Sequence, residues 1–160
     1  MLIDYTTYND VRAALGVSEE DIPDVVLDLN LYADTLTQEF EEIDLTLEST
    51  YTTTKALPVK TAAEARFLTA CNLFATYSVA KQLTATMPLF AAKQVTDGKA
   101  QISRFDNPYR DVIAQVTAQY EKARTRLVAA FGAIGAVTTA TVAKSYFGIV
   151  SPSVDPVTGV

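Results

Sequence analysis

Few residues in this chain have side chains that could perform covalent chemistry. The sequence contains one cysteine, Cys71, and no histidine. Ser-His-Asp triads, Cys-His pairs and the common zinc sites all use histidine as a base or a ligand, so these sites are excluded. Cys71 lies among apolar residues in the middle of a predicted helix. This position is typical of a small core residue rather than of a nucleophile.

A second candidate is the S-x-x-K pattern formed by Ser78 and Lys81, which on a helix places the hydroxyl and the amine on one face. The pattern is typical of serine acyl enzymes of the penicillin-binding kind, but the further motifs of those enzymes are missing. No glycine-rich phosphate loop of the two common types occurs either. The sequence therefore predicts no catalytic residue and no enzymatic activity.

Four acidic residues lie close together: Glu39, Glu41, Glu42 and Asp44. Carboxylate metal sites in helical bundles need acids that face inward from several helices, usually with histidine. Here the acids flank Phe40 and Ile43 on the polar side of an amphipathic pattern, which favours a solvated or interfacial face. We therefore predict neither a metal site nor a cofactor site.

The element that must organise these residues is the stretch Thr61–Thr86, which is apolar or small on nearly every side. A helix of this kind has neighbours on several sides. Thr61 followed by Glu64 three residues later is a capping-box pattern, and Pro88 lies just beyond the expected end. The sequence thus predicts a central helix over 61–86.

Other helices are predicted before and after this one. A short helix over about 7–15 ends at Gly16, and a long acidic amphipathic helix occupies 24–47. Its apolar stripe consists of Val25, Leu29, Tyr32, Leu36, Phe40 and Ile43. The threonine-rich segment 48–60 is expected to be an extended connection. A last helix over 108–131 begins at Pro108 and ends at Gly132.

The remaining segments are predicted to be extended. Asp97-Gly98 is a tight-turn signal, so residues 89–105 are expected to form a β-hairpin-like arm that carries Lys93, Lys99 and Arg104. Residues 132–160 are expected to form an extended C-terminal tail that docks on a partner through Tyr146, Phe147, Ile149 and Val150. The predicted fold class is mainly α, a small bundle of one short and three long helices, divided into 1–131 and 132–160.

Charge is divided unevenly along the chain. Residues 1–50 contain 13 acidic residues and one basic residue, whereas residues 51–160 contain 6 acidic and 12 basic residues. Two interpretations stay open: a solvated acidic face, or a head-to-tail contact between the acidic part of one copy and the basic part of the next. The candidate intersubunit acidic face consists of Asp28, Asp34, Glu39 and Glu42. The net charge of −6 opposes tight binding of duplex DNA.

Targeting signals are not evident. The first residues include Asp4 and lack a basic, apolar leader, and the longest uncharged run, 127–143, is short for a membrane span and contains Gly and Thr. We expect synthesis in the cytoplasm and no membrane span.

Residues 6–131 resemble the head-tail connector (adaptor) proteins of tailed bacteriophages. The resemblance rests on the opening TTYNDVRAALGVSEEDIPDVVLDLNLYADTL, the central helix rich in small residues, the basic arm KQVTDGKAQISRF and the NPYRDVI start of the last helix. It implies a homo-oligomeric ring, commonly dodecameric, in the virion at the head-tail junction. Such a ring binds the portal protein, extends a channel through which double-stranded DNA passes without sequence recognition, and receives a downstream tail or stopper protein.

In terms of residues, the resemblance implies that the arm Lys93–Phe105 reaches the channel or a neighbouring subunit. It also implies that the segment after Gly132 engages the portal. The alternative is a small acidic binding or regulatory protein that uses helix 24–47 as its docking face. Because the central helix has few predicted neighbours, we expect another subunit to cover its surface around Tyr77 to Met87.

Overall fold

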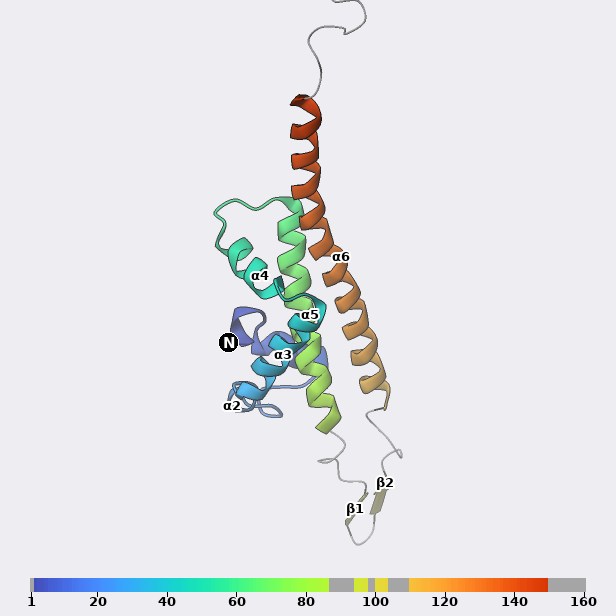
Figure 1. The fold of residues 1–160 in the computed structure, drawn as a ribbon. Helices are drawn as coiled ribbons and strands as arrows, with labels where there is room; N and C mark the ends of the chain where they lie inside the picture. Colours follow the sequence, from blue (N-terminus) through green and yellow to red (C-terminus); the bar gives the residue numbers. More distant parts are fainter. Residues whose placement is uncertain (1, 87–93, 98–99, 104–109, 150–160) are drawn as a thin grey trace, which may run out of the picture.

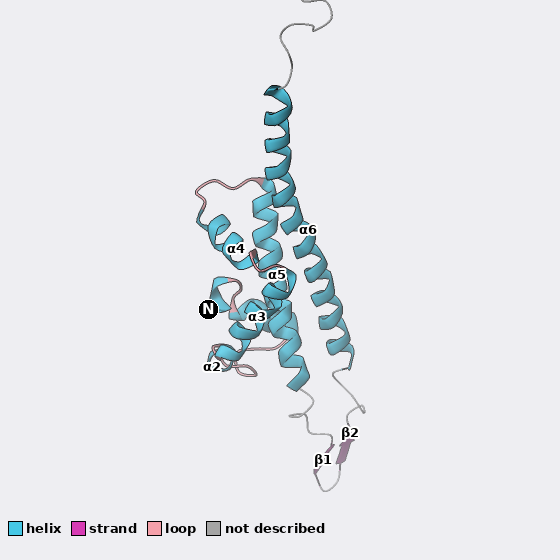
Figure 2. Ribbon diagram, in the orientation of Figure 1, coloured by secondary structure: helices cyan, strands magenta, loops and turns pink. Residues whose placement is uncertain are grey.

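The computed structural model of the chain describes the backbone of residues 2–86, 94–97, 100–103 and 110–149, and the side chains of 2–85 and 110–135. The described chain is mainly helical, which confirms the predicted class (Figures 1 and 2). Its elements are η1 Leu2–Asp4, α1 Tyr8–Leu15, α2 Asp24–Leu27, α3 Asn30–Ile43, α4 Leu47–Ala56, α5 Ala62–Thr86, β1 Gln94–Asp97, β2 Ala100–Ser103 and α6 Arg110–Ile149. Helix α5 stands between α6 on one side and the smaller helices on the other (Figure 1).

Helix α5 begins as the sequence predicts. The Thr61 backbone N–H donates to Glu64 Oε2 at 2.6 Å, and the Glu64 N–H donates back to Thr61 Oγ1 at 3.3 Å. This reciprocal pair satisfies donors that the first turn of a helix leaves without partners. The predicted central helix and its capping box are therefore confirmed.

A column of stacked aromatic rings crosses the core. Ring centroids are 4.6 Å apart for Tyr51 and Tyr5, 5.0 Å for Tyr5 and Phe40, 5.6 Å for Phe40 and Phe74, and 5.4 Å for Phe74 and Tyr120. All five residues are buried. Because they come from α4, the N-terminal segment, α3, α5 and α6, the column joins the smaller helices to α5 and α6.

Hydrogen bonds to residues 4–6 hold the N-terminal segment against α4 and α5. The hydroxyl of Tyr51 donates to the Asp4 carbonyl at 2.6 Å, and the amide of Asn72 donates to the Tyr5 carbonyl at 2.8 Å. The buried hydroxyls of Thr6 and Thr76 lie 2.6 Å apart. These bonds satisfy polar groups that would otherwise be costly to bury.

The single helix predicted over 24–47 is wrong, because the chain turns between α2 and α3. Leu29 is extended, with φ −64° and ψ 132°, and Asp28 accepts a hydrogen bond from the Tyr8 hydroxyl at 2.8 Å. The turn shifts the buried stripe, so that Leu27 is fully buried whereas Val25 and Leu29 are 73% and 52% exposed.

The extended connection predicted over 48–60 is also wrong, because most of it forms α4. Thr52 and Thr53 donate their hydroxyls to the carbonyls four residues earlier, at 3.0 and 2.8 Å. Those bonds accommodate threonine within a helix. The helix ends at Ala56, and the next residue, Leu57, is extended because it precedes a proline.

The extended tail predicted over 132–160 is wrong for residues 132–149, since α6 continues without a break to Ile149, and residues 150–160 lie outside the described residues. No proline occurs between Pro108 and Pro152 to remove a backbone donor. Gly132 costs only about 1 kcal/mol relative to alanine within a helix, which is too little to end one of 40 residues. The predicted boundary between 131 and 132 therefore falls inside one helix.

Strands β1 and β2 pair antiparallel, with Gln94 opposite Ser103 and Asp97 opposite Ala100. The remainder of the arm predicted over 89–105 lies outside the described residues. The β-hairpin-like arm as a whole thus stays a prediction.

Candidate interaction surfaces

The residues considered for catalysis lie in the core of the molecule. Ser78 and Cys71 are fully buried, and burial raises the pKa of the Cys71 thiol to about 12. The Ser78 hydroxyl accepts a hydrogen bond from the Gln82 amide at 3.4 Å, while the Lys81 amine lies 3.7 Å from the centroid of the Tyr120 ring. The side chains of Ser78 and Lys81 thus have separate partners.

The described residues include neither a metal-binding cluster nor a membrane-spanning helix. They contain no group of three or more side chains that could hold a metal ion. Within the same part of the chain, no helix combines the length and apolar character that a membrane span needs.

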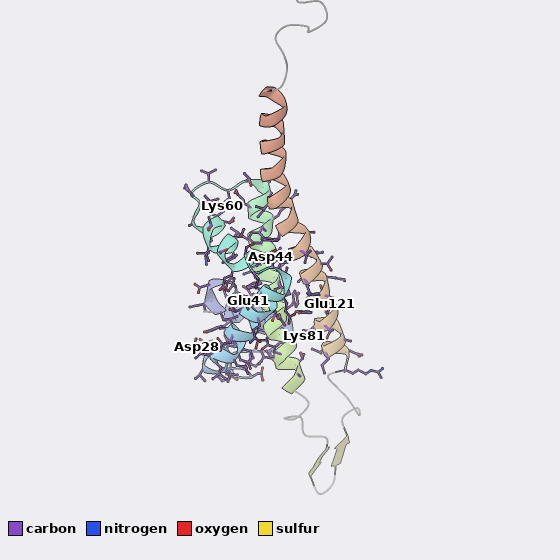
Figure 3. All side chains as sticks on the ribbon, in the orientation of Figure 1. Asp28, Glu41, Asp44, Lys60, Lys81 and Glu121 are labelled. Atoms are coloured by element: carbon purple, nitrogen blue, oxygen red, sulfur yellow. The ribbon has the colours of Figure 1, made fainter. Side chains whose placement is uncertain are left out.

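The acidic residues predicted for an intersubunit face are only partly on the surface. Asp28, Asp34 and Glu42 are exposed, and Asp28 and Glu41 mark this region in Figure 3. Six exposed residues lie at the end of α2, on α3 and in the corner between α3 and α4, and we call them the acidic surface. They are Asp28, Leu31, Asp34, Glu41, Glu42 and Leu45. Leu31 and Leu45 are 64% and 82% exposed, so apolar and acidic side chains alternate here.

Glu39 departs from the predicted acidic face. Its Oε2 atom is buried and has no hydrogen-bond partner among the described residues. Burial first, and then the charge of Glu39, raise the pKa of Tyr120 on α6 to about 12. Glu39 therefore faces α6 within the same protomer, one position from the core residue Phe40.

The raised pKa of Tyr120 leads to a test at alkaline pH. An unperturbed tyrosine ionises near pH 10, whereas Tyr120 in the folded chain stays neutral to about pH 12. Its stabilising contribution is complete below pH 10 and is lost as the pH rises through 12. We expect the urea midpoint to fall across this window, and to fall less in Tyr120→Phe. An equal fall of the urea midpoint with pH in the wild-type protein and in Tyr120→Phe would contradict the raised pKa of Tyr120.

A groove of about 630 Å³ runs between α5 and α6. We call it the alanine groove, because most of its lining is small; the lining residues are Ala63, Ala65, Arg66, Thr69, Ala70, Leu73, Arg126, Ala129, Ala130 and Ala133. Its charged residues, Arg66 and Arg126, are exposed. Neither has an ion-pair partner among the described residues. The groove therefore combines an apolar floor with free positive charge.

The position of this open surface differs from the sequence prediction. The stretch around Tyr77 to Met87 was expected to be covered by another subunit, but Val79, Ala80, Leu83 and Thr84 are buried within the protomer. The open part of α5 is instead its first half. The lining positions 63, 66, 70 and 73 of α5, and 126, 129, 130 and 133 of α6, recur at three- and four-residue spacing, and this was the available signal for the groove.

Most predicted arm and tail residues cannot be assigned a surface. Lys93, Lys99, Arg104 and Val150 lie outside the described residues. Tyr146, Phe147 and Ile149 lie in the last turns of α6. This end of α6 continues past the start of α5, and no other element lies beside it in the described chain (Figure 1).

The described residues form a mainly helical protein with an exposed acidic surface and a groove that carries two exposed arginines. Comparisons with protein families, with characterised proteins and with solved structures found no match for the chain. Any assignment of function therefore depends on the surfaces themselves and on the resemblance seen in the sequence.

Proposed function

We propose that copies of this chain associate head to tail into a closed ring. The observation that carries the proposal is the presence of two different, complementary surfaces on one protomer: the acidic surface and the alanine groove with Arg66 and Arg126. Contact between two unlike surfaces is heterologous, and such contacts form a ring when the rotation between subunits closes. The unequal distribution of charge along the chain supports the same arrangement.

The proposed ring is the connector between the portal of a phage capsid and the tail. This step depends on the resemblance of residues 6–131 to head-tail connector proteins. The ring extends the DNA channel, receives the downstream tail or stopper protein and performs no catalysis. In this proposal the basic arm with Lys93, Lys99 and Arg104 faces the channel or a neighbour. The end of α6, with Tyr146 and Phe147, engages the portal as a helix.

Sedimentation velocity over a range of protein and salt concentrations tests the proposed ring. We expect species many times heavier than the 17.3 kDa protomer at low salt. Raising the salt towards 1 M should shift the equilibrium to protomers, because the Debye length then falls to about 3 Å. Protomers alone at every salt and protein concentration, both with and without the portal protein of the same phage, would contradict the proposal.

The second candidate function is a small acidic binding protein whose docking face is the segment 24–47, which includes most of the acidic surface beside it. The observation that favours it is the exposure of Val25, Leu29 and Leu31 among aspartates. In that case Asp28→Lys with Asp34→Lys should abolish binding to a basic partner protein and leave any oligomer intact. Loss of the oligomer in this variant would favour the ring instead.

A further inference from the structure

We infer that the alanine groove of one copy receives the corner between α3 and α4 of a second copy, with Leu45 inserted between α5 and α6. This inference rests on the proposed function, because it identifies which parts of the two surfaces meet. It is carried by the groove's shape and charge and by the chemistry of the corner.

The groove needs a partner that is apolar at its centre and acidic at its rim. Six of its lining residues are alanines, from both helices, and such small side chains let an incoming side chain approach the two backbones closely. Arg66 on α5 and Arg126 on α6 lie in its lining, and the lining contains no acidic residue. A guanidinium pairs well with a carboxylate, since it can donate two parallel hydrogen bonds.

The corner after α3 has this composition. Leu45 is 82% exposed and does not line the groove of its own protomer, so it is available to another copy. Glu41 and Glu42 precede it and are exposed. Neither glutamate has an ion-pair partner among the described residues.

The corner is also held in a fixed shape before any contact forms. Asp44 Oδ1 accepts hydrogen bonds from the backbone N–H and the hydroxyl of Thr46, at 2.7 and 2.6 Å. These hydrogen bonds lower the pKa of Asp44, which therefore remains charged near neutral pH. A loop that is already ordered loses less conformational entropy when it binds.

Other exposed apolar side chains match the groove less well. Val59 is 83% exposed, but its neighbour is Lys60, which the two arginines would repel. Val25 is 73% exposed, but the nearby acids already have partners within the protomer: Asp24 pairs with Arg12 and Asp28 accepts from Tyr8. Leu31 is 64% exposed, but one exposed acid without an ion-pair partner among the described residues, Asp34, lies a turn after it, whereas the corner with Leu45 offers two, Glu41 and Glu42, to the two arginines.

Cross-linking between two differently labelled copies tests the contact directly. Leu45→Cys in one copy, mixed with Ala129→Cys in another, should give a disulfide-linked pair under mild oxidation. Cys71 is buried and has a raised pKa, so the native thiol should not compete. Val59→Cys mixed with Ala129→Cys is the matched control, since Val59 is as exposed as Leu45.

Charge exchange gives a second, independent readout. Glu41→Arg with Glu42→Arg, and separately Arg66→Glu with Arg126→Glu, should each weaken assembly at least about tenfold, because like charges then face each other across the contact. Combining all four changes in one chain should restore assembly. Arg124→Glu, an exposed α6 arginine outside the groove, is the control and should change assembly little.

The results of the two experiments can contradict this contact without contradicting the ring. A wild-type protein that assembles, together with no Leu45–Ala129 cross-link and unaltered assembly of the charge variants, would overturn the inference and leave the ring in place. A wild-type protein that stays a protomer under all conditions would overturn both. Cross-linking with restored assembly in the fourfold variant is the expected result.

Discussion

Replacing Phe74 with alanine is expected to lower the free energy of unfolding by about 3 to 5 kcal/mol, which is a large part of the stability of a domain of this size. Phe74 is fully buried, and its ring packs between Phe40 of α3 and Tyr120 of α6, with centroids 5.6 and 5.4 Å away. The substitution removes the middle of the aromatic column and leaves a cavity where three helices meet. Urea unfolding followed by circular dichroism measures the change.

The control for Phe74→Ala is Val59→Ala, because Val59 is 83% exposed. Its effect should stay within about 0.5 kcal/mol, as is usual for surface substitutions. Nearly equal urea midpoints for the two variants would show that the column does not hold α3, α5 and α6 together.

Replacing Arg12 with methionine is expected to lower the free energy of unfolding by about 1 to 3 kcal/mol, because it leaves the buried Ile22 carbonyl without its donor. Arg12 is 5% exposed, and its guanidinium joins α1 to the segment before α2. Its Nε donates to the Ile22 carbonyl at 2.9 Å, Nη1 donates to Asn9 Oδ1 at 3.1 Å, and Nη2 contacts Asp24. Methionine retains much of the packing volume but donates no hydrogen bond.

Asp24→Asn distinguishes the contribution of the Arg12 ion pair to stability from the contribution of the hydrogen bonds that Arg12 donates elsewhere. The side chain of Asp24 is 58% exposed, so the loss of its charge should change the free energy of unfolding by less than about 1 kcal/mol. An effect of Asp24→Asn as large as that of Arg12→Met would mean that the ion pair, rather than the bond to the Ile22 carbonyl, fixes this turn.

Patterns within single helices predicted much of the fold. The capping box at Thr61 and Glu64, the left-handed Gly16 after α1, and the apolar residues of α5 all depend on neighbours in the sequence, and the structure agrees with them. Tyr32, Leu36 and Phe40 were also placed correctly on the buried stripe of α3.

The errors arose where contacts between distant residues decide the local conformation. Periodicity did not reveal the turn at Asp28, where the hydroxyl of Tyr8, 20 residues earlier, holds the carboxylate. Threonine content suggested an extended segment at 48–60. There, burial of Tyr51 against Tyr5 and burial of Thr54 favour the helix α4.

The contact surfaces were harder to predict than the core, since a surface depends on what its neighbours leave uncovered. The charge imbalance indicated an acidic face, but Glu39 turned out to face α6 while Leu45 stands exposed beside the acids. The alanine groove required the pairing of α5 with α6, which no local pattern specifies. Arg66 and Arg126 are 60 positions apart and line the same groove only after folding.

Imaging of the purified 160-residue chain at low salt, by negative-stain or cryo-electron microscopy, tests the central claim most directly. We expect closed rings of one diameter with cyclic symmetry, in which every subunit contacts its neighbours through the acidic surface and the alanine groove. Open filaments, two-fold dimers or isolated protomers, both with and without the portal protein of the same phage, would contradict it.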